Sequence, residues 1–421
     1  MAENREDRGK KLTFQRASLD EETESFMTAE RVPKVLWRRR VGTIPRSRRP
    51  RLMIRDIDDD GDLEVLVGLH KLHVLNELGS CEWAFGVRGN LEAIAVGYAH
   101  SGSRLITVGT SRVFDVVVSS ASAISVLQCE GRVYFLTPQG VLLLETSLFG
   151  GMITIATLLD CDSDGQDELC AGTKGIGPRP SGKVVLLSQE GAVNWRHATE
   201  SPVSALLAHG FGNGKPRIFA GTERGELLAL SSTGRLIWQR QVGNDQVMSI
   251  RVASSSKHED CLVVGVRDGT SAVFSLAGSL RWKHIGSLPV VDLCCVDVNG
   301  DAEDEVIVGY VDAIHCIALH GAPMWTVPVD GRLTSLDLLS TQHQSDVQLL
   351  ACADSTGLIL SAATGLVVSD FQMGGYGLVC RAFCSRKNPG WVVCVARPAK
   401  NLLWRLLGCQ DIELVLAAIP Q

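Results

Sequence analysis

The sequence predicts an all-β fold, a β-propeller of four-stranded antiparallel blades. Its apolar runs are short, rich in β-branched residues and bounded by Gly, Asn and Asp, which favours strands over helices. Short strands and turns recur at a period of about 40–50 residues, which is typical of propeller blades. The period is set by Trp195, Trp238, Trp282 and Trp325, spaced 43, 44 and 43 residues apart, and by Gly221, Gly265 and Gly309, spaced 44 apart.

An acidic loop that leads directly into an apolar strand occurs three times. The copies are Asp56–Gly68, Asp160–Gly172 and Asp297–Gly309, and in each the first aspartate lies 12 residues before the strand-ending glycine. Such a constant spacing indicates copies of one structural unit.

The number of blades follows from the outer, Trp-type strands. These lie near residues 37, 83, 145, 195, 238, 282, 325 and 368, so eight blades are predicted, with seven as the alternative. The stretch Val113–Glu130 is irregular. It indicates either a loop inserted into one blade or two degenerate blades merged into one.

Both ends of the chain bear on how the ring closes. Residues 1–32 are highly charged and almost free of apolar residues, so we expect a disordered tail. Residues 35–42 match the outer strand 236–243 but have no strands before them, whereas 391–395 and 402–406 supply inner strands without an outer one. We therefore expect residues 33–410 to form one propeller, in which 35–42 complete the last blade, followed by a C-terminal extension over 411–421.

The acidic loops place oxygen-bearing side chains at positions 1, 3, 5 and 9 of a tight turn. Such sets suit a hard cation such as calcium. Alternatively, the same side chains cap backbone N–H groups of the turn. In either case their role is structural. The candidate ligands are Asp56, Asp58, Asp60 and Glu64 in the first loop, Asp160, Asp162, Asp164 and Glu168 in the second, and Asp297, Asn299, Asp301 and Glu305 in the third.

Composition narrows the class of protein. The formal net charge of −6 gives no reason to expect a nucleic-acid partner. No apolar run reaches the roughly 18–20 residues of a membrane span, and the charged N-terminus lacks the apolar core of a secretory signal. The 13 cysteines include strand positions and show no paired framework, which suits a reducing compartment. We expect a soluble, cytoplasmic protein.

One basic segment stands out. It is either the solvated face of the closing strand and its loop, or a patch for an acidic protein partner, phospholipid head groups or a nuclear import receptor. The segment contains Arg38, Arg39, Arg40, Arg46, Arg48, Arg49 and Arg51.

The repeats resemble two known families. The Asp-x-Asp-x-Asp-Gly loops before an apolar strand resemble integrin-α-type (FG-GAP) propellers, and endings such as Gly234 to Trp238 are similar to quinoprotein-like repeats. The mixture, over about residues 35–410, resembles propeller subunits of the Bardet–Biedl coat complex, the integrin-repeat subunit of the KICSTOR complex and bacterial outer-membrane assembly propellers. The resemblance implies the fold far more than a function.

We therefore expect a non-catalytic protein–protein interaction scaffold, a subunit of a larger intracellular assembly that requires no cofactor beyond possible structural calcium. Its candidate contacts are the basic segment, the charged tail, Val113–Glu130 and Lys174–Lys183. The alternative is a calcium- and quinone-dependent oxidoreductase, a class that often carries a vicinal disulfide. The adjacent Cys294 and Cys295 raise that idea, but successive residues of a strand face opposite sides.

Overall fold

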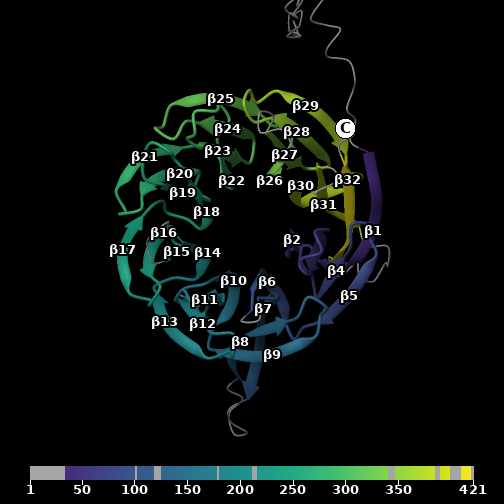
Figure 1. Ribbon diagram of the computed structural model, residues 1–421, viewed down its shortest axis with the longest axis vertical. Coiled ribbons are helices and arrows are strands. Elements are labelled where there is room, and N and C mark those ends of the chain that lie inside the picture. Colours follow the sequence, from purple (N-terminus) through teal and green to yellow (C-terminus); the bar gives the residue numbers. More distant parts are fainter. Residues whose placement is uncertain are drawn as a thin grey trace, which may run out of the picture.

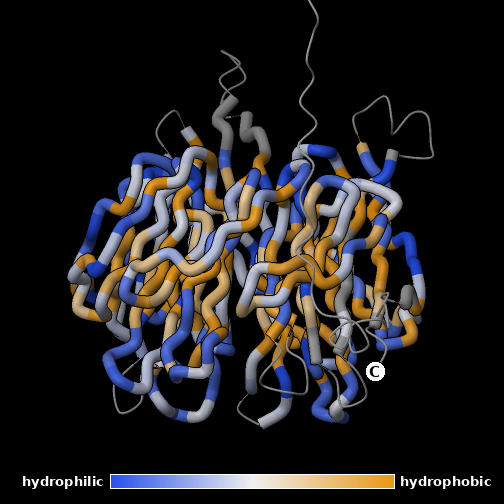
Figure 2. Tube along the Cα trace, turned by 90° about the horizontal axis from the view of Figure 1, so that it is seen from above, coloured by the Kyte–Doolittle hydropathy of each residue, from blue (hydrophilic) through white to orange (hydrophobic). Residues whose placement is uncertain are grey.

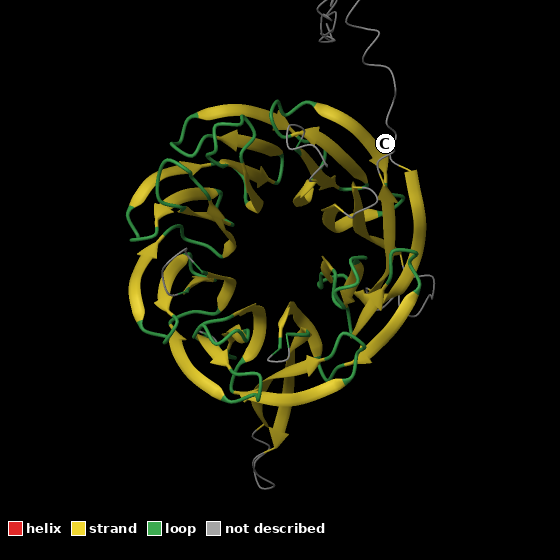
Figure 3. Cartoon of the chain, viewed as in Figure 1, coloured by secondary structure: helices red, strands yellow, loops and turns green. Residues whose placement is uncertain are grey.

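The computed structural model describes residues 34–99, 102–117, 125–177, 180–210, 216–339, 347–384, 389–398 and 409–418. In these ranges the chain forms eight four-stranded antiparallel sheets arranged as blades around a central axis (Figures 1 and 3). The predicted eight-bladed propeller is thus confirmed, and the alternative of seven blades is wrong. The predicted tail over 1–32 lies outside the described residues.

Each blade is named here by its place in the ring, with its strands in order from the inner to the outer one. Blade 1 comprises β2 (Arg51–Arg55), β3 (Glu64–Gly68), β4 (Lys71–Leu75) and β5 (Cys81–Gly86); blade 2, β6 (Asn90–Tyr98), β7 (Arg104–Val117), β8 (Ser125–Leu136) and β9 (Leu142–Phe149); blade 3, β10 (Met152–Leu159), β11 (Glu168–Lys174), β12 (Gly182–Leu187) and β13 (Val193–Thr199); blade 4, β14 (Val203–His209), β15 (Arg217–Thr222), β16 (Glu226–Ser231) and β17 (Leu236–Gln241); blade 5, β18 (Val247–Ala253), β19 (Cys261–Val266), β20 (Thr270–Ser275) and β21 (Leu280–Ile285); blade 6, β22 (Val290–Val296), β23 (Glu305–Tyr310), β24 (Ala313–Ile317) and β25 (Pro323–Pro328); blade 7, β26 (Leu333–Leu339), β27 (Gln348–Ala353), β28 (Thr356–Ser361) and β29 (Val367–Gln372); blade 8, β30 (Tyr376–Cys384), β31 (Pro389–Pro398), β32 (Cys409–Ala418) and β1 (Lys34–Pro45).

The core lies between the blades. Second strands such as β3 and β19 are buried along their whole length, since both faces of the sheet are covered by neighbouring blades. Outer strands such as β29 instead alternate between exposed and half-buried residues, because one face borders water. In the side view, hydrophobic segments concentrate within the ring and hydrophilic ones in the loops of its two faces (Figure 2).

The strand-ending glycines are explained by contact between blades. A Cβ added at Gly221 would lie 2.5 Å from Cγ1 of Val247, which opens the inner strand of the next blade. The same clash recurs at Gly172 with Val203 and at Gly265 with Val290, at 2.6 and 2.7 Å. The absent side chain therefore makes room for the first apolar side chain of the following blade.

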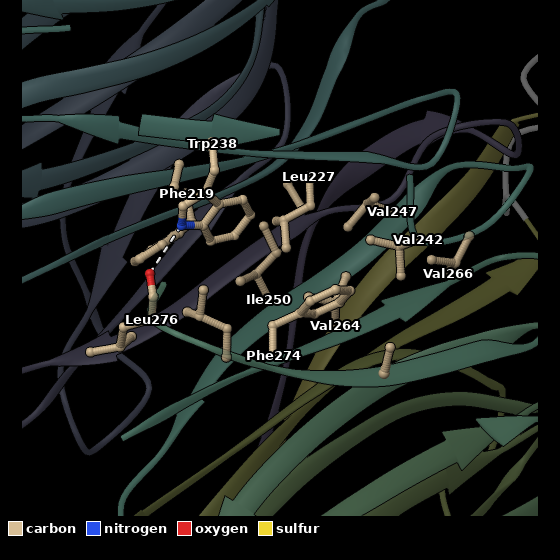
Figure 4. Close-up of a cluster of buried hydrophobic side chains, with 14 residues drawn as sticks. Phe219, Leu227, Trp238, Val242, Val247, Ile250, Val264, Val266, Phe274 and Leu276 are labelled. Carbon is tan, nitrogen blue, oxygen red and sulfur yellow. Dashed lines mark hydrogen bonds between the residues drawn. The ribbon is translucent and has the colours of Figure 1, made fainter. Parts of the chain in front are cut away.

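The outer-strand tryptophans also connect neighbouring blades. Trp238 of β17 donates its indole N–H to the carbonyl oxygen of Leu276 in blade 5, at 3.0 Å, and packs within the cluster shown in Figure 4. Its ring also covers Gly278, where an added Cβ would lie 2.7 Å from the indole. Corresponding bonds of 2.8–3.0 Å run from Trp37 to Glu77, Trp83 to Pro138, Trp195 to Ser232, Trp282 to Leu319 and Trp325 to Ala362.

The ring closes through blade 8, where the N-terminal strand pairs with a C-terminal one. The pairing of β1 with β32 runs from Lys34 opposite Ala418 to Pro45 opposite Cys409, and β1 forms the outer edge, as predicted. The predicted C-terminal extension over 411–421 is wrong as far as Ala418, since β32 is the third strand of the blade. The predicted strand over 402–406 lies outside the described residues.

The irregular stretch of blade 2 forms a long hairpin within a single blade. Strands β7 and β8 pair from Ile106 opposite Leu136 to Val117 opposite Ser125, well beyond Ser111, where β7 stops pairing with β6. Figure 1 shows this hairpin projecting from the ring below β9. The two merged blades considered from the sequence are therefore excluded, and the stretch expected to be irregular is mostly extended strand.

Candidate functional site

The two faces of the ring differ in their loops. Loops from the inner to the second strand lie on one face, here the acidic face, which carries 56–63, 160–167 and 297–304. Loops from an outer strand to the next inner strand lie on the opposite face, here the mouth face, which carries Arg46–Pro50. We consider the two faces in turn.

In blades 1 and 3 the acidic loops bring three carboxylates together. One oxygen each from Asp56, Asp58 and Glu64 lies within 4.8 Å of the others, and Asp160, Asp162 and Glu168 form the equivalent group. The glutamate is buried in both loops and accepts the backbone N–H at position 2, at 3.0 Å from Ile57 and 2.7 Å from Cys161. Asp60 and Asp164 are not part of these groups; each accepts a backbone N–H two residues on.

Electrostatics show that these carboxylates are crowded. Burial and, to a lesser extent, the nearby Asp58 raise the pKa of Glu64 to about 7, against the lowering effect of the Ile57 N–H. Burial and neighbouring aspartates likewise raise the pKa of Glu168 to about 7. A hard cation held by such oxygens would relieve this repulsion, so the donor sets of both loops fit calcium.

The third loop has an amide side chain where the other two have a carboxylate. Asn299 replaces the aspartate at position 3, and its Nδ2 donates to Oε1 of Glu305 at 2.9 Å. An N–H thus lies where the other loops present a second carboxylate. Lys257 of blade 5 also approaches Asp301, with Nζ–Oδ2 at 3.6 Å. In loop 297–304 the negative charges of Glu305 and Asp301 are therefore balanced by the Asn299 amide and by Lys257. The set Asp297, Asn299, Asp301 and Glu305 fits a cation poorly.

The sequence did not reveal a second use of these loops, which is to hold a neighbouring blade. Asp167 accepts the backbone N–H of Tyr98 at 2.7 Å, and Asp304, at the same loop position, accepts that of Ser254 at 2.8 Å. In blade 1 the equivalent position is Leu63, but Arg104 of blade 2 binds Asp59 at 2.8 Å. The loops thus clamp neighbouring blades with or without a metal.

The structure divides the seven arginines into two groups. Arg38 and Arg39 donate to the carbonyl oxygens of Met373 and Gly79, and Arg40 forms a 2.8 Å ion pair with the buried Asp411. These three therefore help to close the ring, while their side chains remain exposed.

The other arginines lie on the mouth face. Arg48 donates to Oδ1 of Asn90, and Arg51 forms a 3.6 Å ion pair with Glu92. Arg46 and Arg49 are exposed and make no hydrogen bond or ion pair with the residues that the structure describes.

A cavity of about 1,190 Å³ opens at this face. Its wall includes the beginnings of the inner strands β2, β6, β10, β14 and β18 and the loop residues Arg48 and Arg49. Lys174 and Arg267 contribute two further cations, which are paired with Glu223 and Asp245 at 2.8 Å each. We call this space the mouth cavity.

The inner strands of blades 5 to 8 carry charges that the sequence analysis did not single out. Arg251 pairs with Asp292 at 3.3 Å, and Asp337 accepts the N–H of Ala382 at 2.9 Å. Burial alone would lower the pKa of Arg381, but Asp337 and Asp292 raise it above its usual value. The sequence feature that could have revealed them is a charged residue in the middle of an otherwise apolar inner strand. The positive charges of the two arginines and the negative charges of the two aspartates largely neutralise one another.

The adjacent cysteines lie within the blade. Cys294 is buried against the cluster that includes Ile307 and Leu336, whereas Cys295 packs on the cluster around Val306, so the two side chains face different neighbours, as predicted. Both are free thiols, and burial raises the pKa of Cys295 to about 12. Their placement is that of core residues.

None of the described residues forms a helix of the length and apolarity needed to cross a bilayer. No curated protein sequence matches the chain. Among solved structures, BamB from Moraxella catarrhalis is similar with a TM-score of 0.54 at 15% identity, covering 90% of this chain and 97% of that one. BBS1N in complex with ARL6DN is similar in a mercury-soaked crystal (TM-score 0.54, 12% identity, 92% and 97% covered) and a lead-soaked one (0.52, 12%, 88% and 92%).

At such identities the likeness to solved structures concerns the fold alone. A family model gives the stronger result: the one described as outer membrane protein assembly factor BamB matches residues 180–405, which is more than half of the 421-residue chain. The match begins within blade 3 and ends within blade 8, and it contains four successive Trp–Gly contacts between blades, from Trp195–Gly234 to Trp325–Gly365. The chain therefore belongs to the BamB family of quinoprotein-like propellers.

Proposed function

We propose that this protein is a non-catalytic propeller subunit that binds protein partners within a larger intracellular assembly. The proposal depends on where polar side chains lack a partner within the protein. Polar groups of the channel and of the acidic loops bind one another or neighbouring blades. The mouth face instead combines a large cavity with cations such as Arg49, which has no partner among the described residues. Rigid scaffolds that present loops in this way are typical of recognition surfaces.

Proteins of the same fold support the proposal by analogy. BBS1N was crystallised in complex with ARL6DN, and BamB is described as an assembly factor. Both cases concern association with other proteins. Carrying them over to this chain is an inference from fold and family.

The competing function is a calcium- and quinone-dependent oxidoreductase. One observation favours it, namely the group of cations around the mouth cavity, which could hold an anionic cofactor. We favour the scaffold because Cys294 and Cys295 pack in the blade core, and because the charges of the inner strands, such as Arg251 and Asp292, are engaged with one another.

Two further features belong to the proposal. The loops of blades 1 and 3 would each bind a structural calcium ion through Asp56, Asp58 and Glu64 or Asp160, Asp162 and Glu168. The protein would be cytoplasmic, where a reducing environment keeps cysteines reduced, as are the 11 whose side chains the structure describes.

The test is to purify the tagged protein from its own cells and to measure mass after size exclusion together with a visible absorption spectrum. Stoichiometric partners that co-elute well above the 45.4 kDa of the chain would support the scaffold. A coloured monomer whose redox activity disappears with a chelator would contradict it and establish the oxidoreductase.

A further inference from the structure

The mouth cavity has the size of a site for a polypeptide segment. Its volume of about 1,190 Å³ exceeds the range of about 300–1,000 Å³ that is usual for small-molecule pockets. Its wall draws on six consecutive blades, from Thr43 of blade 8 through blade 1 and onward to Met248 of blade 5. A site this wide and this open favours an extended chain over a compact ligand.

Cations approach the cavity from opposite sides of the ring. Arg48 and Arg49 lie in the loop that joins β1 of blade 8 to β2 of blade 1, whereas Lys174 ends β11 of blade 3 and Arg267 follows β19 of blade 5. Blades 1 and 5 stand across the ring from each other (Figure 1). Cationic groups therefore lie on both sides of the mouth, and those of blades 3 and 5 are each paired with a carboxylate.

The cations on the far side are held in place. Lys174 pairs with Glu223 at 2.8 Å, and Arg267 binds Asp245 through Nε at 3.1 Å and Nη2 at 2.8 Å. Their side chains stay 36% and 53% exposed, so N–H groups remain available to a ligand. Pre-positioned donors of this kind lose little entropy on binding an anion.

On the near side, guanidinium groups crowd one another. Arg49 has no partner among the described residues, and Arg51 lies close to both Arg49 and Arg381. Burial lowers the pKa of Arg51; Glu92 opposes this, and the charges of Arg49 and Arg381 lower the pKa further. Like charges held together in this way are unfavourable, and a bound anion would relieve the repulsion.

We infer that the mouth cavity binds an extended, acidic segment of a partner protein, with Arg49 and Arg48 on one side and Lys174 and Arg267 on the other. The inference rests on the proposed scaffold function and assigns it a site and a partner chemistry. A membrane surface fits less well. Lys174 and Arg267 line the wall of a cavity, where a flat bilayer would reach them less readily than an extended chain would.

The test measures fluorescence anisotropy of a labelled peptide of alternating Glu and Asp against the full-length protein, with the Gln/Asn peptide of the same length as the neutral probe. Arg49→Glu should weaken binding of the acidic peptide about tenfold, and Lys174→Gln about threefold. Arg46→Glu is the matched control. It makes the same charge change in the same loop, at an exposed residue that does not line the cavity, and should alter binding less than about twofold.

Several results would overturn the inference. They are an acidic peptide that binds no better than the neutral one, an equal loss in Arg46→Glu and Arg49→Glu, or tighter binding to phosphatidylserine vesicles than to the peptide. Arg49 makes no contact that the described fold needs, and thermal melts of each variant verify folding. If Arg49→Glu loses the peptide but still co-purifies with all partners, the mouth site fails while the scaffold stands. If the peptide binds as expected but no partner co-purifies, the scaffold fails.

Discussion

At Gly221 the repeat leaves no space for a side chain, because Val247 of the next blade occupies it. Val247 is fully buried and branched at Cβ, so it has few other rotamers to adopt. The regular glycine spacing in the sequence thus results from one contact that is repeated between blades. This is why the period could be read from residue types alone: each copy of the contact demands the same small residue.

We predict that Gly221→Ala destabilises the protein by about 1–3 kcal/mol, since the new Cβ would lie 2.5 Å from Cγ1 of Val247 and the dense core cannot yield without strain. Urea unfolding measures the change. Gly210→Ala is the control, because nothing lies within 4 Å of a Cβ at that position. Adding Val247→Ala should restore part of the loss, and a purely additive double mutant would contradict the proposed clash.

Among the elements, the acidic loops show most clearly how one motif diverges. All three keep the first aspartate, whose oxygens accept N–H groups three and five residues on: Asp59 and Gly61 in blade 1, Gly300 and Ala302 in blade 6. They differ at position 3, where Asn299 supplies its own N–H to Glu305. The predicted turn chemistry therefore holds for every copy, whereas the suitability for a cation depends on one side chain.

We predict that calcium raises the melting temperature and that a chelator lowers it. A ligand that binds only the folded state stabilises by about 2.7 kcal/mol at a free concentration 100 times its Kd. Differential scanning calorimetry with and without calcium measures the effect, and titration calorimetry gives the stoichiometry, expected to be two from the two carboxylate groups.

The variants separate binding from simple capping of the turns. The double variant Asp58→Asn, Asp162→Asn should abolish the calcium response, and Asn299→Asp should add a third site by removing the competing amide. A melting temperature that responds to neither calcium nor chelator would show that the carboxylates only cap backbone N–H groups.

At the scale of the whole molecule, contacts between distant parts of the chain limit what a sequence can reveal. Arg38 and Arg40 bind Met373 and Asp411, which are 335 and 371 residues away. Their local sequence looks like a basic patch, and only the closed ring shows that they serve blade 8. The mouth cavity is equally non-local, since Lys174 and Arg267 join Arg49 only when the blades are set in a circle. Repeated local contacts were predictable; sites assembled across the ring were not.

Closure of the ring is the property that we expect to govern its stability. Strand β1 covers the edge of β32 and contributes Ile44 to a core cluster with Leu414 and Leu416. Without it, the buried Asp411 would lose Arg40, and an apolar strand edge would face water. A buried carboxylate that loses its arginine partner and an open strand edge are both costly, and open edges promote aggregation.

We predict that removing residues 1–45 lowers the melting temperature and produces oligomers, whereas removing only residues 1–33 leaves both unchanged, because β1 begins at Lys34. Circular dichroism melts and light scattering after size exclusion measure the two properties. Adding a peptide of residues 34–45 to the shorter protein should restore the monomer, because β-strand addition would re-form the β1–β32 pairing. A 46–421 protein that stays monomeric and melts at the temperature of the full chain would show that blades 1 to 7 hold the ring together without this closure.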